Sequence, residues 1–205
     1  MVTDKHKTRR AQAWRLGLLV LTTAACIALR PTRMLPKINK SHVGSQRSPA
    51  VNITPTFDTD DDLAFWDNWI GSRGGEWHED YATRTQKRDL SEEFRALVTK
   101  TWINIGKPKT ARILDVGPGP LTALGTLWPG VDVELRVMDP SAEAYQRLLA
   151  KHKVSPPVTP EVCSMTGIAD KYAENYFDVI NLPDSLKKSS NPLETLLQCT
   201  RSIRP

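Results

Sequence analysis

Hydrophobic positions follow a helical period through the first part of the folded region. From residue 58 onward, apolar side chains recur at three- and four-residue spacing behind an acidic first turn, which suits the positive start of a helix. Gly71 ends this pattern, and a second helical pattern covers residues 90–98, with Ser91 as a capping residue. The pattern predicts a helical leader over residues 58–110.

Short apolar runs rich in β-forming residues replace this pattern after residue 110. Strands are expected over about residues 112–117, 133–138, 158–163 and 177–182. Apolar residues at helical spacing predict a helix over residues 121–127, directly after the first strand, and another over residues 193–203. Trp66, Trp69 and Trp77 of the leader are expected to be core residues or a lid over a ligand.

The first of these strands runs into a glycine turn. It ends in Asp115, and Gly117 and Gly119 follow. Glycine lets the backbone pass close to a ligand, and the amides of a following helix start offer hydrogen-bond donors to the ligand's polar part. The second strand ends at Asp139, about 20 residues beyond Gly119, which is the spacing of an acid that binds ribose hydroxyls. The alternative is an ordinary strand, loop and helix without a ligand.

The same turn argues against a dinucleotide such as NAD or FAD. Thr122 stands where the third glycine of the G-x-G-x-x-G pattern belongs, and Pro118 and Pro120 crowd the turn.

Three segments in order resemble motifs of class I S-adenosylmethionine (SAM)-dependent methyltransferases. Residues 113–119 resemble the first motif, residues 137–140 the second and residues 177–181 the fourth. The resemblance covers residues 111–205 and implies an α/β, Rossmann-like fold with a partial parallel sheet of about four strands. Leu121 departs from the family pattern, because it replaces the usual third glycine.

The resemblance also assigns the cofactor and its binding residues. Asp115, Gly117 and Gly119 would line the methionine side of SAM, and Asp139 would hold its ribose hydroxyls. The adenine would lie near residues 164–166. The implied activity is transfer of a methyl group to an unidentified, small-molecule acceptor, and the alternative is a catalytically silent SAM-fold module that binds a ligand or a partner.

Two side chains are weak candidates for catalysis. Asp184 is the obvious polar residue after the fourth strand, and His78 stands among leader acids as a proton-transfer group or a solvated surface residue. Methyl transfer can run on the alignment of sulfonium and nucleophile, so a missing base does not exclude activity.

An acidic cluster at residues 58–62 supports a different hypothesis. Its D-x-D pattern is typical of glycosyltransferases that hold a metal on a sugar nucleotide, which gives a lumenal glycosyltransferase as a third hypothesis. Capping of the leader helix explains the same residues, and we expect no metal site.

Three scattered cysteines suit neither a disulfide framework nor a zinc site, so Cys163 and Cys199 are expected to be buried.

The amino-terminal region is expected to be a targeting segment. Residues 1–30 combine a basic start with an apolar run, which predicts a cleaved signal peptide or a signal anchor that contacts the membrane through residues 11–29. Residues 31–57, rich in proline, predict a disordered linker. The expected location is the membrane or the secretory pathway, with the compartment open.

Charge and the chain end bear on partners. The net charge of +5 is the sum of +9 in residues 1–50 and −4 in the remainder, which is mildly acidic, so we expect no nucleic-acid partner. Residues 201–205 resemble the turn that leads into a further strand of the family fold. We therefore expect an open sheet edge beside residues 177–182 that invites a protein partner, and a truncated or inactive product is an alternative.

Overall fold

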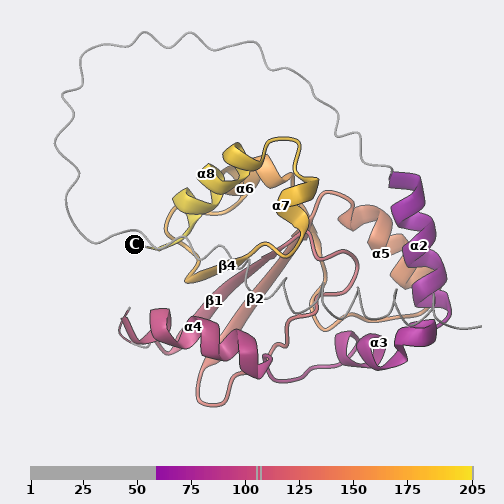
Figure 1. Ribbon diagram of the computed structural model, residues 1–205, viewed down its shortest axis with the longest axis horizontal. Helices are drawn as coiled ribbons and strands as arrows, with labels where there is room; N and C mark the ends of the chain where they lie inside the picture. Colours follow the sequence, from indigo (N-terminus) through magenta and orange to yellow (C-terminus); the bar gives the residue numbers. More distant parts are fainter. Residues whose placement is uncertain (1–58, 105, 107, 205) are drawn as a thin grey trace, which may run out of the picture.

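The computed structural model describes residues 59–204, except residues 105 and 107 (Figure 1). The predicted signal or anchor segment 1–30, its membrane-contacting run 11–29 and the linker 31–57 lie outside the described residues. Within the described part, none of the helices combines the length and the apolar character that a membrane crossing requires.

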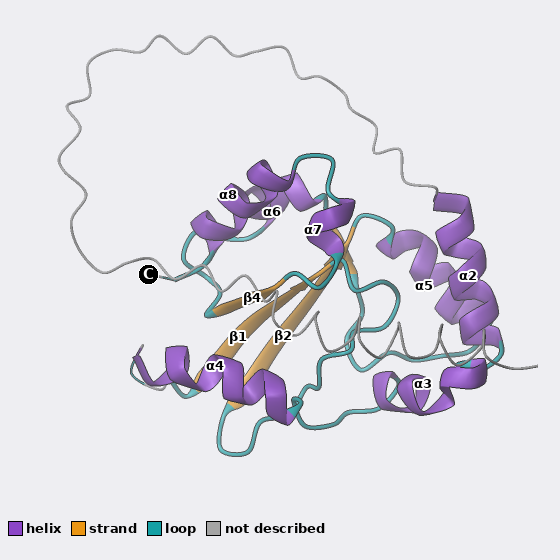
Figure 2. Ribbon diagram, viewed as in Figure 1, coloured by secondary structure: helices purple, strands orange, loops and turns teal. Residues whose placement is uncertain are grey.

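A parallel four-stranded sheet forms the centre of the fold (Figure 2). Its strands are β1 (Thr110–Val116), β2 (Asp132–Asp139), β3 (Glu161–Val162) and β4 (Val179–Asn181), in the order β3-β2-β1-β4. The α/β fold with a parallel sheet is confirmed, although the strand expected over residues 158–163 shortens to two residues. Parallel pairing brings the carboxyl ends of β1, β2 and β4 to one edge, since Asp115 pairs with Asn181 and Val116 with Met138.

Helices cover both faces of this sheet. They are α2 (Thr59–Gly71), α3 (His78–Arg84), α4 (Glu92–Asn104), α5 (Ala142–Lys151), α6 (Ile168–Lys171), α7 (Ser185–Lys188) and α8 (Pro192–Ser202), with short 3₁₀ turns at Gly75–Trp77 and Met165–Gly167. Alternate residues of β1 face opposite layers: Ile113 packs with the side chains of α4, and Leu114 packs with those of α6 and α8. Figure 1 shows these helices on different sides of the strands.

Most of the predicted helices are confirmed. The patterns at residues 58–71, 90–98 and 193–203 correspond to α2, α4 and α8, and Ser91 caps α4 because its hydroxyl accepts the Phe94 amide at 3.1 Å. Cys163 and Cys199 are buried, as expected. Helix α3 begins at His78, directly after the 3₁₀ turn at Gly75–Trp77.

The helix predicted over residues 121–127 is wrong. These residues form an extended loop, in which the Thr126 and Leu127 amides donate to the Arg88 carbonyl and the Leu90 amide donates back to Leu127. Gly125 permits this pairing because its backbone lies directly against that of Asp89. The leader therefore pairs with the loop after the glycine turn, and this pairing replaces the intrahelical hydrogen bonds.

The leader helix α2 docks on α5 beside the glycine turn. Trp69 and Ile70 pack with Leu121 and Leu149 in one buried cluster. Asp67 supplies the polar contact, because its carboxylate binds Lys151 Nζ at 2.7 Å and the adjacent His152 Nε2 at 2.6 Å. These hydrogen bonds, from Lys151 first, hold the pKa of Asp67 below its ordinary value. This docking places Trp66, which precedes Asp67 in α2, near the carboxyl edge of the sheet.

β4 is the outer strand on its side of the described sheet. Two residues before β4 begins, Phe177 forms a parallel bridge with Ile203, and the Arg204 amide donates to the Phe177 carbonyl at 2.8 Å. The last described residues thus begin to cover this edge. A protein partner at the rest of the edge stays a prediction.

Candidate functional site

The predicted ligand-binding residues meet at the carboxyl edge of the sheet. Asp115 is the last residue but one of β1, and Asp139 is the last residue of β2. The glycine turn directly follows β1. Ligands of open α/β sheets bind outside this edge. The structure therefore brings Asp115, Gly117, Gly119 and Asp139, which the sequence analysis grouped, together at this edge.

The glycine turn adopts a backbone conformation that favours glycine. Gly117 has a φ of +68° and Gly119 a φ of +84°, both in the left-handed region. The Gly117 amide donates to the Met138 carbonyl at 2.7 Å, so the turn stays close to the end of β2. The two proline neighbours of Gly119 carry no amide proton, which limits the donors that this turn offers.

Asp139 holds the turn in place. One carboxylate oxygen accepts the Gly119 amide at 3.2 Å, and the other accepts the Ser141 amide at 2.8 Å. The side chain is buried, and this burial raises the pKa of Asp139, while the two backbone hydrogen bonds oppose the rise. The end of β2 and the turn after β1 thus form one hydrogen-bonded unit.

Asp115 braces the loop that follows. Its carboxylate accepts a hydrogen bond from Thr122 Oγ1 at 2.6 Å and another from Asn181 Nδ2 at 2.7 Å. Only 1% of the residue is exposed, and burial raises the pKa of Asp115 to about 6. Thr122, the residue that breaks the dinucleotide pattern, also accepts the Leu124 amide at 2.9 Å. Asp115 therefore organises the loop from inside the protein.

Side chains of this chain fill the space that the glycines leave. A Cβ placed on Gly119 would lie 2.8 Å from Trp66 Cζ2, and one on Gly117 would lie 2.7 Å from Ser185 Cβ and 3.1 Å from Met165 Cε. Trp66 thus lies against the turn, as a lid would, whereas Trp69 is core and Trp77 is 52% exposed. Figure 1 shows α7 beside the carboxyl ends of the strands.

An ion pair joins the two elements that carry these side chains. Lys188 Nζ of α7 lies 3.3 Å from a carboxylate oxygen of Asp62 in α2. Both side chains are partly exposed, so the pair contributes little to stability. The carboxyl edge is therefore closed by α2 on one side and α7 on the other.

The two weak catalytic candidates lie outside this arrangement. His78 is exposed at the start of α3, and within the described residues no hydrogen bond or ion pair joins it to Asp115 or Asp139. Asp184 is also exposed, with its carboxylate 2.9 Å from Lys187 Nζ. The predicted adenine region at residues 164–166 contributes Met165, which contacts Gly117.

Two polar residues at the end of β4 are absent from the predicted site. Asn181 binds Asp115, and Ser185 packs against Gly117 with its Oγ buried and without a hydrogen-bond partner among the described residues. Asn181 lies near the end of the strand predicted over residues 177–182, and Ser185 follows that strand shortly after. This position was the available signal, because the carboxyl ends of parallel strands share one edge.

The acidic cluster of the leader does not form a metal centre in the described residues. Asp60, Asp61 and Asp62 occupy the first turn of α2, and no three His, Cys, Asp or Glu side chains of the described chain lie close enough together to hold a metal ion. Asp58 lies outside the described residues. A metal site at this cluster stays a hypothesis.

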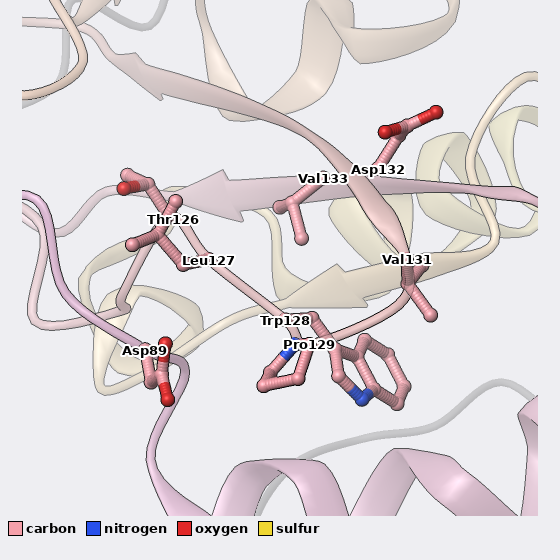
Figure 3. Close-up of a pocket in the computed structure, with 8 residues that line it drawn as sticks. All are labelled: Asp89, Thr126, Leu127, Trp128, Pro129, Val131, Asp132 and Val133. Carbon is pink, nitrogen blue, oxygen red and sulfur yellow. The ribbon is translucent and has the colours of Figure 1, made fainter.

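A separate cavity of about 450 Å³ lies at the opposite edge of the sheet (Figure 3). Asp89, residues 126–129 and residues 131–133 line it, and these include the start of β2. Because Asp132 pairs with Thr110 at the beginning of β1, this cavity is at the amino ends of the strands. It includes none of the predicted ligand-binding residues.

No protein-family model and no curated protein sequence match the chain. Among solved structures, the chain is similar to a Methanococcus maripaludis protein described as a candidate S-adenosyl-L-methionine-dependent methyltransferase, with 17% sequence identity and a TM-score of 0.39. The match covers 66% of this chain and 60% of that protein.

Proposed function

We propose that this chain binds SAM at the carboxyl edge of its sheet and passes the methyl group to a small-molecule acceptor. The hydrogen bond between the Gly119 amide and the Asp139 carboxylate carries this proposal. It joins a glycine turn after one strand to an acid at the end of the next, which is the combination that nucleoside ligands use in α/β sheets.

The residue types at this edge fit SAM. Gly117 and Gly119 leave a cradle in which a backbone can approach a ligand, and Asp139 is an acid suited to ribose hydroxyls. The Ser185 hydroxyl is a further polar group without a partner in the described chain. The cradle itself is filled by Trp66 and Ser185, so binding requires these side chains to move.

SAM supplies an electrophilic methyl group on its sulfonium when it is bound. The chain's own contribution is to position that group and to exclude water, with Asp139 and the glycine turn holding the ligand and Trp66 covering it. Asp115 acts one step further away, because it orders the loop through Thr122.

A SAM-binding module without catalysis is the second candidate. The observation that favours it is the position of the polar side chains: both oxygens of Asp115 and of Asp139 already accept hydrogen bonds, and Asp184 and His78 are exposed outside the site. Within the described chain, both carboxylates at the glycine turn are therefore already engaged in positioning the backbone and the loop.

Titration calorimetry of the full chain with SAM tests the proposal. We expect saturable binding, and we expect Asp139→Ala to weaken it about tenfold to a hundredfold, since the variant loses charge-assisted hydrogen bonds. Asp178→Ala is the matched control. Asp178 is also a buried carboxylate that accepts a backbone amide, that of Arg112 at 2.8 Å, but it lies before β4 at the other edge. We expect this variant to bind SAM with unchanged affinity.

The remaining outcomes separate the hypotheses. If the full chain does not bind SAM, both the enzyme and the silent module are wrong, and binding of a sugar nucleotide with manganese would favour the glycosyltransferase instead. If SAM binds, incubation of methyl-labelled SAM with a metabolite extract decides between the first two, because only the enzyme releases labelled product.

A further inference from the structure

Ser185 is a buried hydroxyl without a hydrogen-bond partner in the described chain. It begins α7, 1% of the residue is exposed, and no described group lies within hydrogen-bonding distance and geometry of its Oγ. Buried polar groups in proteins are almost always hydrogen-bonded, because an unmet hydroxyl loses its water without gaining a partner. Such a group at the edge of a proposed ligand site calls for a partner from outside the chain.

The hydroxyl lies beside the glycine turn. A Cβ built on Gly117 would be 2.7 Å from Ser185 Cβ and 3.6 Å from its Oγ. Gly117 has no side chain to meet the hydroxyl, and its own amide is already bonded to Met138. A ligand that lies along the turn would therefore pass within reach of Ser185.

Helix α7, which carries Ser185, contacts α2 through a weak surface ion pair. α7 is four residues long and follows Asp184, which has a left-handed φ of +44°. Its far end is joined to α2 through the partly exposed ion pair between Lys188 and Asp62. Access of a ligand to the hydroxyl requires a small outward shift of α7, and the exposed ion pair to α2 is a weak contact that such a shift would break.

We propose that Ser185 is a ligand-binding residue, and that its hydroxyl donates a hydrogen bond to a polar acceptor group of the SAM molecule held at the Gly117–Gly119 turn. This assignment rests on the proposed function and deepens it. It adds a polar contact from the end of β4 to the contacts predicted from β1 and β2.

The test compares Ser185→Ala with Ser202→Ala in the full chain. Ser202 is the matched control, because it is also buried with a partnerless Oγ but ends α8, away from the glycine turn. Both variants remove an unmet hydroxyl, so both are expected to raise the thermal midpoint of the ligand-free protein by about 2–4 °C. Only Ser185→Ala is expected to weaken SAM binding, by about fivefold, as the loss of one neutral hydrogen bond predicts.

Each result bears on a different claim. Unchanged SAM affinity in Ser185→Ala overturns the assignment while the proposed function stands. A thermal midpoint that rises in Ser202→Ala but not in Ser185→Ala overturns it as well, because the Ser185 hydroxyl then has a partner within the chain. If the wild-type chain does not bind SAM, the proposed function fails and the assignment fails with it.

Discussion

Replacing Gly125 with alanine is expected to destabilise the protein by about 3 kcal/mol or more. A Cβ at this position would overlap the backbone carbonyl of Asp89, and a backbone group cannot turn aside as a flexible side chain can. The substitution would force apart the loop after the glycine turn and the leader segment that pairs with it. Urea denaturation measures the change in the free energy of unfolding.

Gly130→Ala is the matched control for this prediction. Gly130 has a left-handed φ of +78°, but a Cβ there meets no atom within 4 Å. The control therefore carries backbone strain without a clash, and its expected cost is about 1 kcal/mol. Equal losses in the two variants would contradict the observed pairing between the leader and the loop.

When the pH is lowered from 7 to 4, the free energy of unfolding of the wild-type protein is expected to rise relative to that of Asp115→Asn by about 2–3 kcal/mol. Burial raises the pKa of Asp115 from its ordinary value of 3.8 to about 6, so the folded state binds the proton more tightly than the unfolded state. The resulting stability is fully present below about pH 4 and is lost as the pH rises through about 6. An asparagine in its place does not titrate.

The comparison isolates Asp115 from other carboxylates. Burial also raises the pKa values of Asp139 and Asp178, but these residues are present in both proteins, so the difference between the two proteins reports mainly on Asp115. Urea denaturation of both proteins at several pH values between 4 and 7 gives the required free energies. Parallel curves for the two proteins would mean that Asp115 is not desolvated as the structure has it.

The strands and the glycine turn are predictable because their signals are local. β-forming residues between turn residues mark β1, β2 and β4, and the spacing from Gly119 to Asp139 follows from a turn and a crossover of ordinary length. Asp115 and Asp139 could be grouped for the same reason, since parallel strands bring their carboxyl ends together.

The loop after the glycine turn is not predictable from spacing alone. Leu121, Leu124 and Leu127 recur as they would on one helix face, yet the structure sends them to different places. Leu121 packs with Trp69 of α2, Leu124 packs with the cluster beneath α4, and Leu127 is largely exposed. Pairing with the leader overrides the local preference, and this pairing depends on residues far apart in the sequence.

The closure of the site depends on contacts of the same non-local kind. Trp66 lies against Gly119 because Asp67 and Ile70 dock α2 on α5, and Ser185 lies against Gly117 because β4 pairs with β1. Neither contact follows from the pattern around the residue itself. Sequence position could suggest that these residues are near the site, but not that they fill it.

Hydrogen exchange of individual amides, with and without SAM, tests most directly whether the carboxyl edge is the ligand site. We predict that SAM changes the exchange rates of the Gly117, Gly119 and Ser141 amides, because these groups bond to Met138 and Asp139 around the turn. Unchanged rates at these amides under saturating SAM, or changes confined to residues 126–133 around the cavity at the opposite edge, would contradict the assignment.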